Sequence, residues 1–233
     1  MRVHRTAIVP LVLMSLVVAA CGSSSSSSSS SSTSQKSASS GGSQQASSGN
    51  SGGASVSSGP LGFEGVPIEQ GPDIAPASTT QNGTVDGIQC GSKEQLAYHI
   101  HAHLAVFDNG KPRALPGGIG IPGSQVVNTD QGPVAAGGQC IYWLHTHAPD
   151  GVIHVESPTQ RIYTLGNFFD EWHQPLSATR VGDVRGKVTA LVNGKRWTKD
   201  LSAIPLVPHA VIQLNLGSPA VPFQSISWAQ TGL

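Results

Sequence analysis

Histidines are the main candidates for functional residues in this 233-residue chain. Eight of the nine histidines fall within residues 84–233, and six of these form two closely spaced groups. The six candidate metal ligands are His99, His101, His103, His145, His147 and His154. Neutral imidazole is a good ligand for zinc and copper, and it also binds iron and nickel. The two groups therefore predict a transition-metal site, with zinc or copper as the first candidates.

The spacing brings these histidines together if their segments are β-strands. Residues 96–107 alternate with period two, so the first three histidines would share one face, about 7 Å apart. A four-residue turn at 148–151 would set His145 opposite His154, with their Cβ atoms roughly 5 Å apart. Glu156 falls on the same face in this register. An HxH pair on one strand plus a histidine from a neighbouring strand is typical of three-histidine zinc sites.

Two carboxylates near the second histidine group are candidate catalytic residues. Asp150 and Glu156 could act as a metal ligand, as an orienting group or as a general base. Clustered histidines have other uses as well, since their ordinary pKa near 6.5 suits pH sensing. His173 and His209 stand apart from the two groups, and we expect each of them to be a hydrogen-bonded residue of the core. His173 could instead interact with the dipole at the C-terminal end of the predicted helix.

Residues 1–20 have the pattern of a secretory signal peptide. Arg2 and Arg5 precede an apolar stretch that is too short, and interrupted by Pro10, to form a stable membrane span. The stretch ends in Val-Ala-Ala-Cys21, which resembles the bacterial lipobox. That resemblance implies cleavage before Cys21 and attachment of diacylglyceryl and palmitate chains to it. We therefore expect a lipid-anchored protein at the extracytoplasmic face of the cell membrane.

Residues 21–83 predict a disordered tether rich in Ser, Gly and Pro. Between Gly22 and Ser58 the chain holds 21 Ser and six Gly. Such a segment has too little apolar surface to offset the entropy of ordering itself. The remainder, up to Gly83, adds prolines and a few apolar residues that could pack partly onto a folded domain.

The two cysteines outside the signal region predict a disulfide. Cys90 and Cys140 would lie in an oxidising compartment, where a pair of cysteines usually joins. The competing interpretation is that Cys140 is a copper thiolate near His145. Copper–thiolate sites commonly add an axial methionine, but both methionines of this chain lie in the signal peptide.

Residues 84–233 predict a single His-rich globular domain made mostly of strands. Asn109-Gly110 and Asn193-Gly194 favour type I′ hairpin turns, because both turn positions tolerate a positive φ. A helix is expected to begin near Thr164 and to end before Pro175. We predict a mainly β fold, a sandwich or small barrel built from hairpins, with one short helix. The alternative is an α+β fold whose C-terminal part is β-grasp-like.

Charge and hydropathy exclude two classes of protein. The 13 basic and 13 acidic side chains balance, and there is no basic stripe that could neutralise phosphates, so we expect no nucleic-acid partner. No apolar run of about 20 residues follows the N-terminal segment, which excludes a protein with several membrane-spanning helices.

Three segments together resemble a family of His-rich secreted proteins and lipoproteins of actinobacteria and other prokaryotes. They are YHIHAHLAVFDNGK (98–111), CIYWLHTHAPDGVIHVESP (140–158) and YTLGNFFDEWHQPL (163–176). The resemblance covers most of residues 89–217. The resemblance implies a location in the cell envelope, and it supports treating the histidine motifs as one unit. It implies no particular reaction.

These observations favour a membrane-tethered domain that captures or delivers a transition metal through its histidines. A metal-dependent envelope enzyme, hydrolytic or oxygen-using, is the first alternative, with Glu156 or Asp150 in proton transfer. An envelope interaction module without a metal, whose histidines form a core network, is the second.

Overall fold

The computed structural model describes residues 59–77 and 83–233. Its longer strands are Tyr98–Asp108 (β2), Val126–Thr129 (β4), Gly132–Ala135 (β5), Val152–Ser157 (β8), Val188–Val192 (β13) and Ala210–Leu216 (β16), of which β4 and β5 form a separate two-stranded sheet. The shorter strands are Cys90–Gly91 (β1), Lys111–Arg113 (β3), Ile141–Tyr142 (β6), Leu144–His145 (β7), Tyr163–Thr164 (β9), Leu176–Ser177 (β10), Arg180–Val181 (β11), Val184–Arg185 (β12), Lys195–Trp197 (β14) and Pro205–Leu206 (β15). The helices are α1 (Leu165–Trp172) and the 3₁₀ turns Leu201–Ala203 and Trp228–Gln230.

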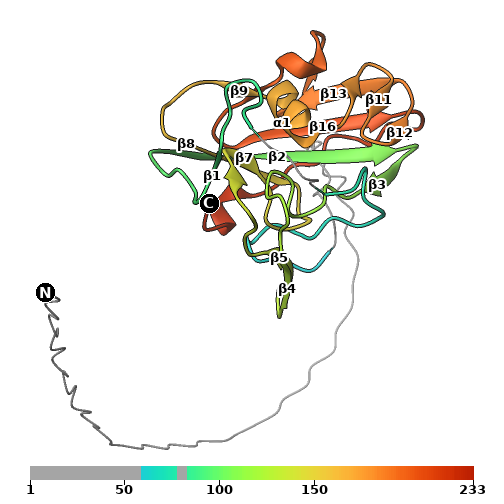
Figure 1. Cartoon of the computed structure of the whole chain (residues 1–233). Coiled ribbons are helices and arrows are strands. Elements are labelled where there is room, and N and C mark those ends of the chain that lie inside the picture. Colours follow the sequence, from blue (N-terminus) through green and yellow to red (C-terminus); the bar gives the residue numbers. More distant parts are fainter. Residues whose placement is uncertain (1–58, 78–82) are drawn as a thin grey trace, which may run out of the picture. The chain divides into compact units, whose positions relative to one another are not determined.

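A seven-stranded mixed sheet forms the centre of the fold (Figure 1). Its strand order is β14-β13-β16-β2-β8-β7, and β3 pairs with the far end of β2. The β2 and β16 strands run parallel, while the other pairs in this sheet are antiparallel. The prediction of a mainly β protein with one short α-helix is confirmed for the described residues. None of their sheets closes into a barrel.

The two faces of β2 have different chemistry, as the period-two pattern predicts. Ala102, Leu104 and Val106 point into the hydrophobic core, where each is almost completely buried. His101 and His103 alternate with them and therefore point to the opposite face. Burying the apolar face fixes the register of the strand, because a slip of one residue would exchange the two faces.

Helix α1 packs its apolar side into this core. Thr164 caps its N-terminus in a capping box with Asn167, and Phe168, Phe169 and Trp172 are buried. The helix ends at His173, whose left-handed backbone (φ 55°) closes the last turn. The predicted helix limits are therefore confirmed.

Both predicted hairpin turns are also confirmed. Asn109 and Gly110 have φ values of 50° and 79°, and Asn193 and Gly194 have φ values of 48° and 76°. Two consecutive positive φ angles define the type I′ turn, whose twist matches that of the flanking strands. The first turn joins β2 to β3, and the second joins β13 to β14.

The folded part extends further toward the N-terminus than the sequence predicted. We expected the tether to continue to residue 83, but residues 59–77 pack against the domain. Val66 and Ile74 are 1% and 0% exposed, and the Ile74 amide donates to the Ala114 carbonyl at 2.9 Å. Burial of these two apolar side chains contributes to offsetting the entropy of ordering the segment.

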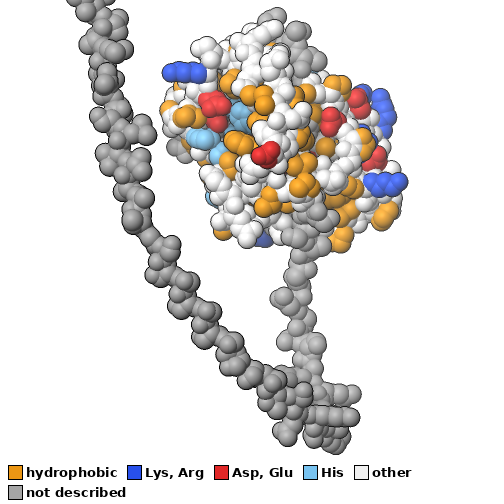
Figure 2. Space-filling view, turned by 90° about the horizontal axis from the view of Figure 1, so that it is seen from below, with side chains coloured by type: hydrophobic (Ala, Val, Ile, Leu, Met, Phe, Trp, Pro, Cys, Tyr) orange, Lys and Arg blue, Asp and Glu red, His pale blue; other side chains and the backbone are white. Residues whose placement is uncertain are grey.

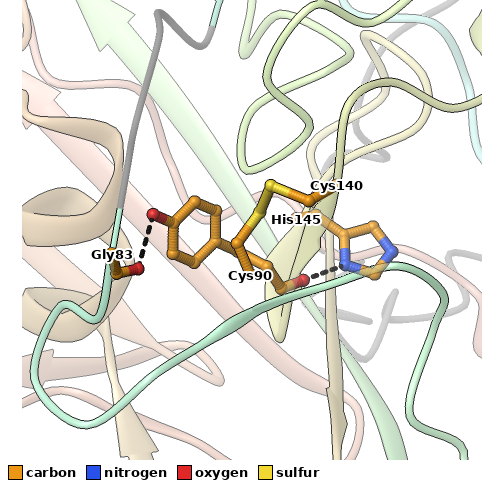
Figure 3. Close-up of a disulfide and its surroundings, with 5 residues drawn as sticks. Gly83, Cys90, Cys140 and His145 are labelled. Atoms are coloured by element: carbon orange, nitrogen blue, oxygen red, sulfur yellow. Dashed lines mark hydrogen bonds between the residues drawn. A yellow bond between two sulfur atoms is a disulfide. The ribbon is translucent and has the colours of Figure 1, made fainter.

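Cys90 and Cys140 form a disulfide, as predicted, and the copper-thiolate alternative is therefore excluded (Figure 3). Their Cα atoms lie 5.4 Å apart. The bond reinforces the pairing of β1 with β6, in which Cys90 is opposite Tyr142. The Tyr142 hydroxyl donates to the Gly83 carbonyl at 2.9 Å. The disulfide holds the segment that leads directly into β7 and to His145.

The predicted signal peptide, the Cys21 anchor and most of the tether lie outside the described residues. Among residues 59–77 and 83–233, no helix has both the length and the apolar character needed to cross a membrane.

Candidate metal centre

Five histidines and Glu156 meet on the face of the central sheet opposite the hydrophobic core. Strand pairing places His101 and His145 on either side of His154, and it places His99 opposite Glu156. The predicted opposition of His145 and His154 is confirmed. Trp143 also lies opposite Glu156, because its carbonyl accepts the Glu156 amide at 2.8 Å.

The first HxH pair lies on β2 with its reactive nitrogens in contact. The Nε2 atoms of His99 and His101 are 2.9 Å apart. The His99 side chain is 38% exposed, whereas His101 is buried. Burial, together with the charges of His154 and His99, lowers the pKa of His101 to about 3. His101 is therefore a neutral imidazole at physiological pH, which is the form that binds metals.

The second HxH pair has its tautomers fixed by the backbone. Nδ1 of His145 donates to the Tyr142 carbonyl at 2.9 Å, and Nδ1 of His147 donates to the Ala135 carbonyl at 3.0 Å. In the neutral rings both Nε2 atoms then carry a lone pair and no hydrogen. These two Nε2 atoms face each other at 3.2 Å, an arrangement that is repulsive unless a cation or a proton lies between the lone pairs.

That separation matches the separation of two ligands on one metal ion. Two nitrogens at 2.0–2.1 Å from a tetrahedral zinc ion are about 3.3 Å apart. Burial also lowers the pKa of His145 well below its ordinary value, and the charges of His154 and His147 add to the effect. His145 is therefore neutral at physiological pH, which is the form of imidazole that binds metals.

His154 is held between two carboxylates. Its Nε2 lies 2.6 Å from Glu64 Oε1, and its Nδ1 lies 3.3 Å from Glu156 Oε1. Burial lowers the pKa of His154, but hydrogen bonding and charge from Glu156 and Glu64 outweigh that effect and raise it to about 9. A carboxylate that fixes one imidazole nitrogen while the other faces a metal is a common arrangement around bound ions.

Glu156 lies at the centre of the cluster. Its Oε1 is 3.1 Å from His99 Nε2 and 3.9 Å from His145 Nε2, and the side chain is 3% exposed. On the far side of the second pair, His147 Nε2 lies 3.4 Å from Glu94 Oε1. Both HxH pairs thus have a carboxylate oxygen within reach.

Three sets of described side chains bring their donor atoms within 4.8 Å of one another. They are His99, His101 and His154; His145, His147 and His154; and Glu94, His145 and Glu156. Each set could hold a metal ion. Three nitrogen donors suit zinc or copper, and a carboxylate completes such a site.

The sixth predicted ligand, His103, is not part of these sets. Its Nε2 donates to the Asp150 carbonyl at 3.0 Å, and the ring is buried behind the pocket. Burial lowers its pKa to about 4, although the hydrogen bond to Asp150 acts in the opposite direction. His103 follows the predicted alternation of β2, but it lies two residues beyond His101 along the strand and outside the cluster.

Asp150 is likewise buried away from the cleft. Its Oδ1 accepts the Val152 amide at 3.2 Å. Burial raises its pKa well above the ordinary range, and the charge of Glu64 raises it further. Of the two predicted catalytic candidates, only Glu156 lines the pocket that holds the histidines.

The cluster opens into a cleft of about 600 Å³. His99, His101, His147 and His154 line it together with Glu64, Glu94 and Glu156. The opposite wall is apolar and includes Phe63 and residues 134–136 at the end of β5. Figure 2 shows histidine side chains at the surface with acidic and hydrophobic side chains around them. The cleft is large enough for a small molecule.

Sequence reasoning missed two of these carboxylates. Glu64 lies in the segment that was assigned to the tether, and Glu94 precedes β2 in a loop. Phe63-Glu64 followed by Val66 gave a weak signal, because a charged residue among apolar ones interrupts an otherwise Ser-, Gly- and Pro-rich segment. Nothing local indicated that this segment returns to His154.

The expectation of a buried core position is wrong for both isolated histidines, because His173 and His209 are exposed. His173 forms the C-cap of α1 and is exposed. His209 stacks on Trp228 with ring centroids 4.8 Å apart, and its backbone amide donates to the His101 carbonyl at 2.8 Å.

No protein family, curated protein or solved structure matches the chain. The geometry described above therefore carries the functional argument.

Proposed function

We propose that this protein is an extracytoplasmic lipoprotein, anchored through Cys21, that binds a transition metal ion for capture or delivery at the cell envelope. The ligands come from His99, His101, His145, His147 and His154, with Glu156 beside them. Zinc or copper suits this donor set best, and iron or nickel follow.

The observation that carries this proposal is the His145–His147 pair. Both Nδ1 atoms donate to backbone carbonyls, so both Nε2 lone pairs face each other at 3.2 Å. The backbone thus positions two ligand nitrogens in advance at the spacing of a metal-coordination shell. Advance positioning of this kind favours binding, because the side chains lose little further freedom when the ion arrives.

The test is metal binding by the full chain, purified without a polyhistidine tag. Equilibrium dialysis against zinc or cobalt, followed by elemental analysis, should give stoichiometric binding at micromolar metal. His145→Gln and His147→Gln should each weaken it at least tenfold, while the exposed His173→Asn should bind as the wild type does. Wild-type protein that retains no metal under these conditions would refute the proposal.

A metal-dependent enzyme is the second candidate, and the cleft favours it. About 600 Å³ of space adjoins the ligand nitrogens, so a substrate could reach a bound ion. Glu156 would then move a proton at the metal. Azide added to the cobalt-loaded protein should change its visible spectrum if a coordination position is open. An unchanged spectrum would favour capture or delivery over catalysis.

The lipid anchor, the envelope location and the likeness to His-rich envelope proteins rest on the sequence. The disulfide is consistent with them, because such bonds persist in oxidising compartments outside the cytosol.

A further inference from the structure

We infer that the histidine pocket is a dinuclear centre, in which two metal ions share Glu156 as a bridging carboxylate. This inference rests on the proposed function, since it concerns the same pocket. One ion takes His99, His101 and Nδ1 of His154, and the second takes His145, His147 and Glu94. Glu156 lies between the two sets.

The number of donor atoms is the first argument. The three donor sets together contain five histidines and two glutamates. A zinc ion in a protein takes about four ligands, so seven donors exceed the needs of one ion. Seven donors with one carboxylate shared give each of two ions a set of four.

The separation of the two HxH pairs is the second argument. Ligands on opposite sides of one octahedral ion, with bonds of about 2.1 Å, are only about 4.2 Å apart. The pairs His99–His101 and His145–His147 belong to two donor sets that share only His154, each gathered within 4.8 Å. No set among the described residues contains both pairs, although within each pair the Nε2 atoms are only 2.9 and 3.2 Å apart. Each pair thus fits an ion of its own.

Glu156 has the position that a bridging ligand needs. Its Oε1 lies 3.1 Å from His99 of the first set and 3.9 Å from His145 of the second. The Oε2 atom of Glu156 is buried and has no hydrogen-bond partner. A buried carboxylate oxygen without a donor is costly, and coordination of a second ion by this oxygen would remove that cost.

Each set also has its own orienting groups. Glu64 holds Nε2 of His154, which leaves Nδ1 directed at Glu156. The Tyr142 and Ala135 carbonyls hold the second pair. Glu64, Glu94 and Glu156 line the same pocket, so a carboxylate lies beside each of the two donor sets.

Copper(II) is the probe for the test, because it reports both the number of bound ions and how close together they lie. The full chain is dialysed against copper(II), and its metal content is compared with its integrated electron paramagnetic resonance intensity. We expect two ions per chain, with the intensity reduced below two spins by coupling through the bridge. His99→Gln and Glu94→Gln alter partly exposed side chains, one in each set, and each variant should bind one uncoupled ion. Glu156→Gln should abolish the coupling.

The His173→Asn protein serves as the matched control and should bind two coupled ions. Thermal unfolding of each variant shows whether it is folded before its metal is counted. One ion per wild-type chain, lost equally on substitution in either set, would overturn the dinuclear centre and leave the proposed function standing. Two ions with the full intensity of isolated spins would overturn the bridge. Absence of bound metal would overturn both proposals.

Discussion

His154 Nε2 lies 2.6 Å from Glu64 Oε1, although the two residues are 90 positions apart in the chain. Both side chains are almost completely buried. The contact joins the segment of residues 59–77 to β8 of the central sheet, and it decides which nitrogen of His154 faces Glu156. Residues 59–77, which were predicted to belong to the tether, thus contribute Glu64 to the site.

Replacing Glu64 should therefore weaken metal binding without removing a ligand. We expect Glu64→Gln to lower the metal affinity roughly 10–100-fold, the usual effect of losing a group that orients a ligand. Competition with a chelating dye measures this change. Asp183→Asn, at a carboxylate that is 62% exposed and paired with Arg180, is the matched control and should leave the affinity unchanged. Equal affinity in the Glu64 variant and the wild type would contradict the role assigned to this contact.

The disulfide should matter for both stability and the site. Cys90 and Cys140 are separated by 50 positions, and closing such a loop contributes about 4 kcal/mol in the chain-entropy model. We expect Cys90→Ser to lower the free energy of unfolding by roughly that amount, as measured by urea denaturation.

The same substitution should affect the two HxH pairs unequally. The disulfide holds the strand that leads to His145, whereas His99 and His101 lie within the long β2 strand. Copper binding by the second pair should weaken more than binding by the first. Equal loss at both pairs would mean that the bond stabilises the whole domain and does not position the site.

The local parts of this fold could be predicted from the sequence. The period-two pattern gave β2 and its histidine face, and Asn-Gly pairs gave both hairpin turns. The opposition of His145 and His154 followed from the length of the turn at 148–151. These features depend on neighbouring residues, whose geometry is set by backbone sterics and by burial of one strand face.

The parts that were missed depend on contacts distant in sequence. Glu64 contacts His154 from outside the predicted domain, and no local pattern specifies which loop covers a sheet face. His147 lies beyond the end of β7, and its Nδ1 donates to the carbonyl of Ala135 in β5. In both cases, contacts between residues distant in sequence decide where the side chain lies.

Glu171 should contribute more to the stability of the fold in mild acid than at neutral pH. The side chain lies on α1 and is 1% exposed. Burial raises its pKa well above the ordinary value of 4.5, although a hydrogen bond from the Leu144 backbone lowers it in part. An acid whose pKa is raised by folding favours the folded state fully below its unfolded pKa. That contribution is lost as the pH rises through the raised value.

Glu171→Gln removes this titration and should raise the melting temperature at pH 8 but hardly at pH 4. For a chain of this size each kcal/mol corresponds to about 2–4 °C. Scanning calorimetry of the metal-free protein at both pH values measures the difference. A Gln variant that is less stable than the wild type at pH 8 would show that the charged carboxylate stabilises the fold.

Anchoring through Cys21 predicts a clear change in fractionation. In the native host, the wild-type protein should sediment with membranes and dissolve in detergent. The Cys21→Ala protein should not be processed by the lipoprotein pathway, and it should lack the mass of the attached lipid. Mass spectrometry of the purified N-terminal peptide measures this directly. An unmodified Cys21 in the wild-type protein would refute the anchor.

Anomalous X-ray diffraction from crystals grown with zinc would locate any metal ion bound by the pocket histidines. We expect strong anomalous peaks on the histidine face of β2, β7 and β8. One should lie about 2.0–2.1 Å from the Nε2 atoms of His145 and His147, the distance of a zinc–imidazole bond. Peaks confined to the exposed His173, or no peak in the pocket at saturating zinc, would contradict metal binding by the pocket histidines.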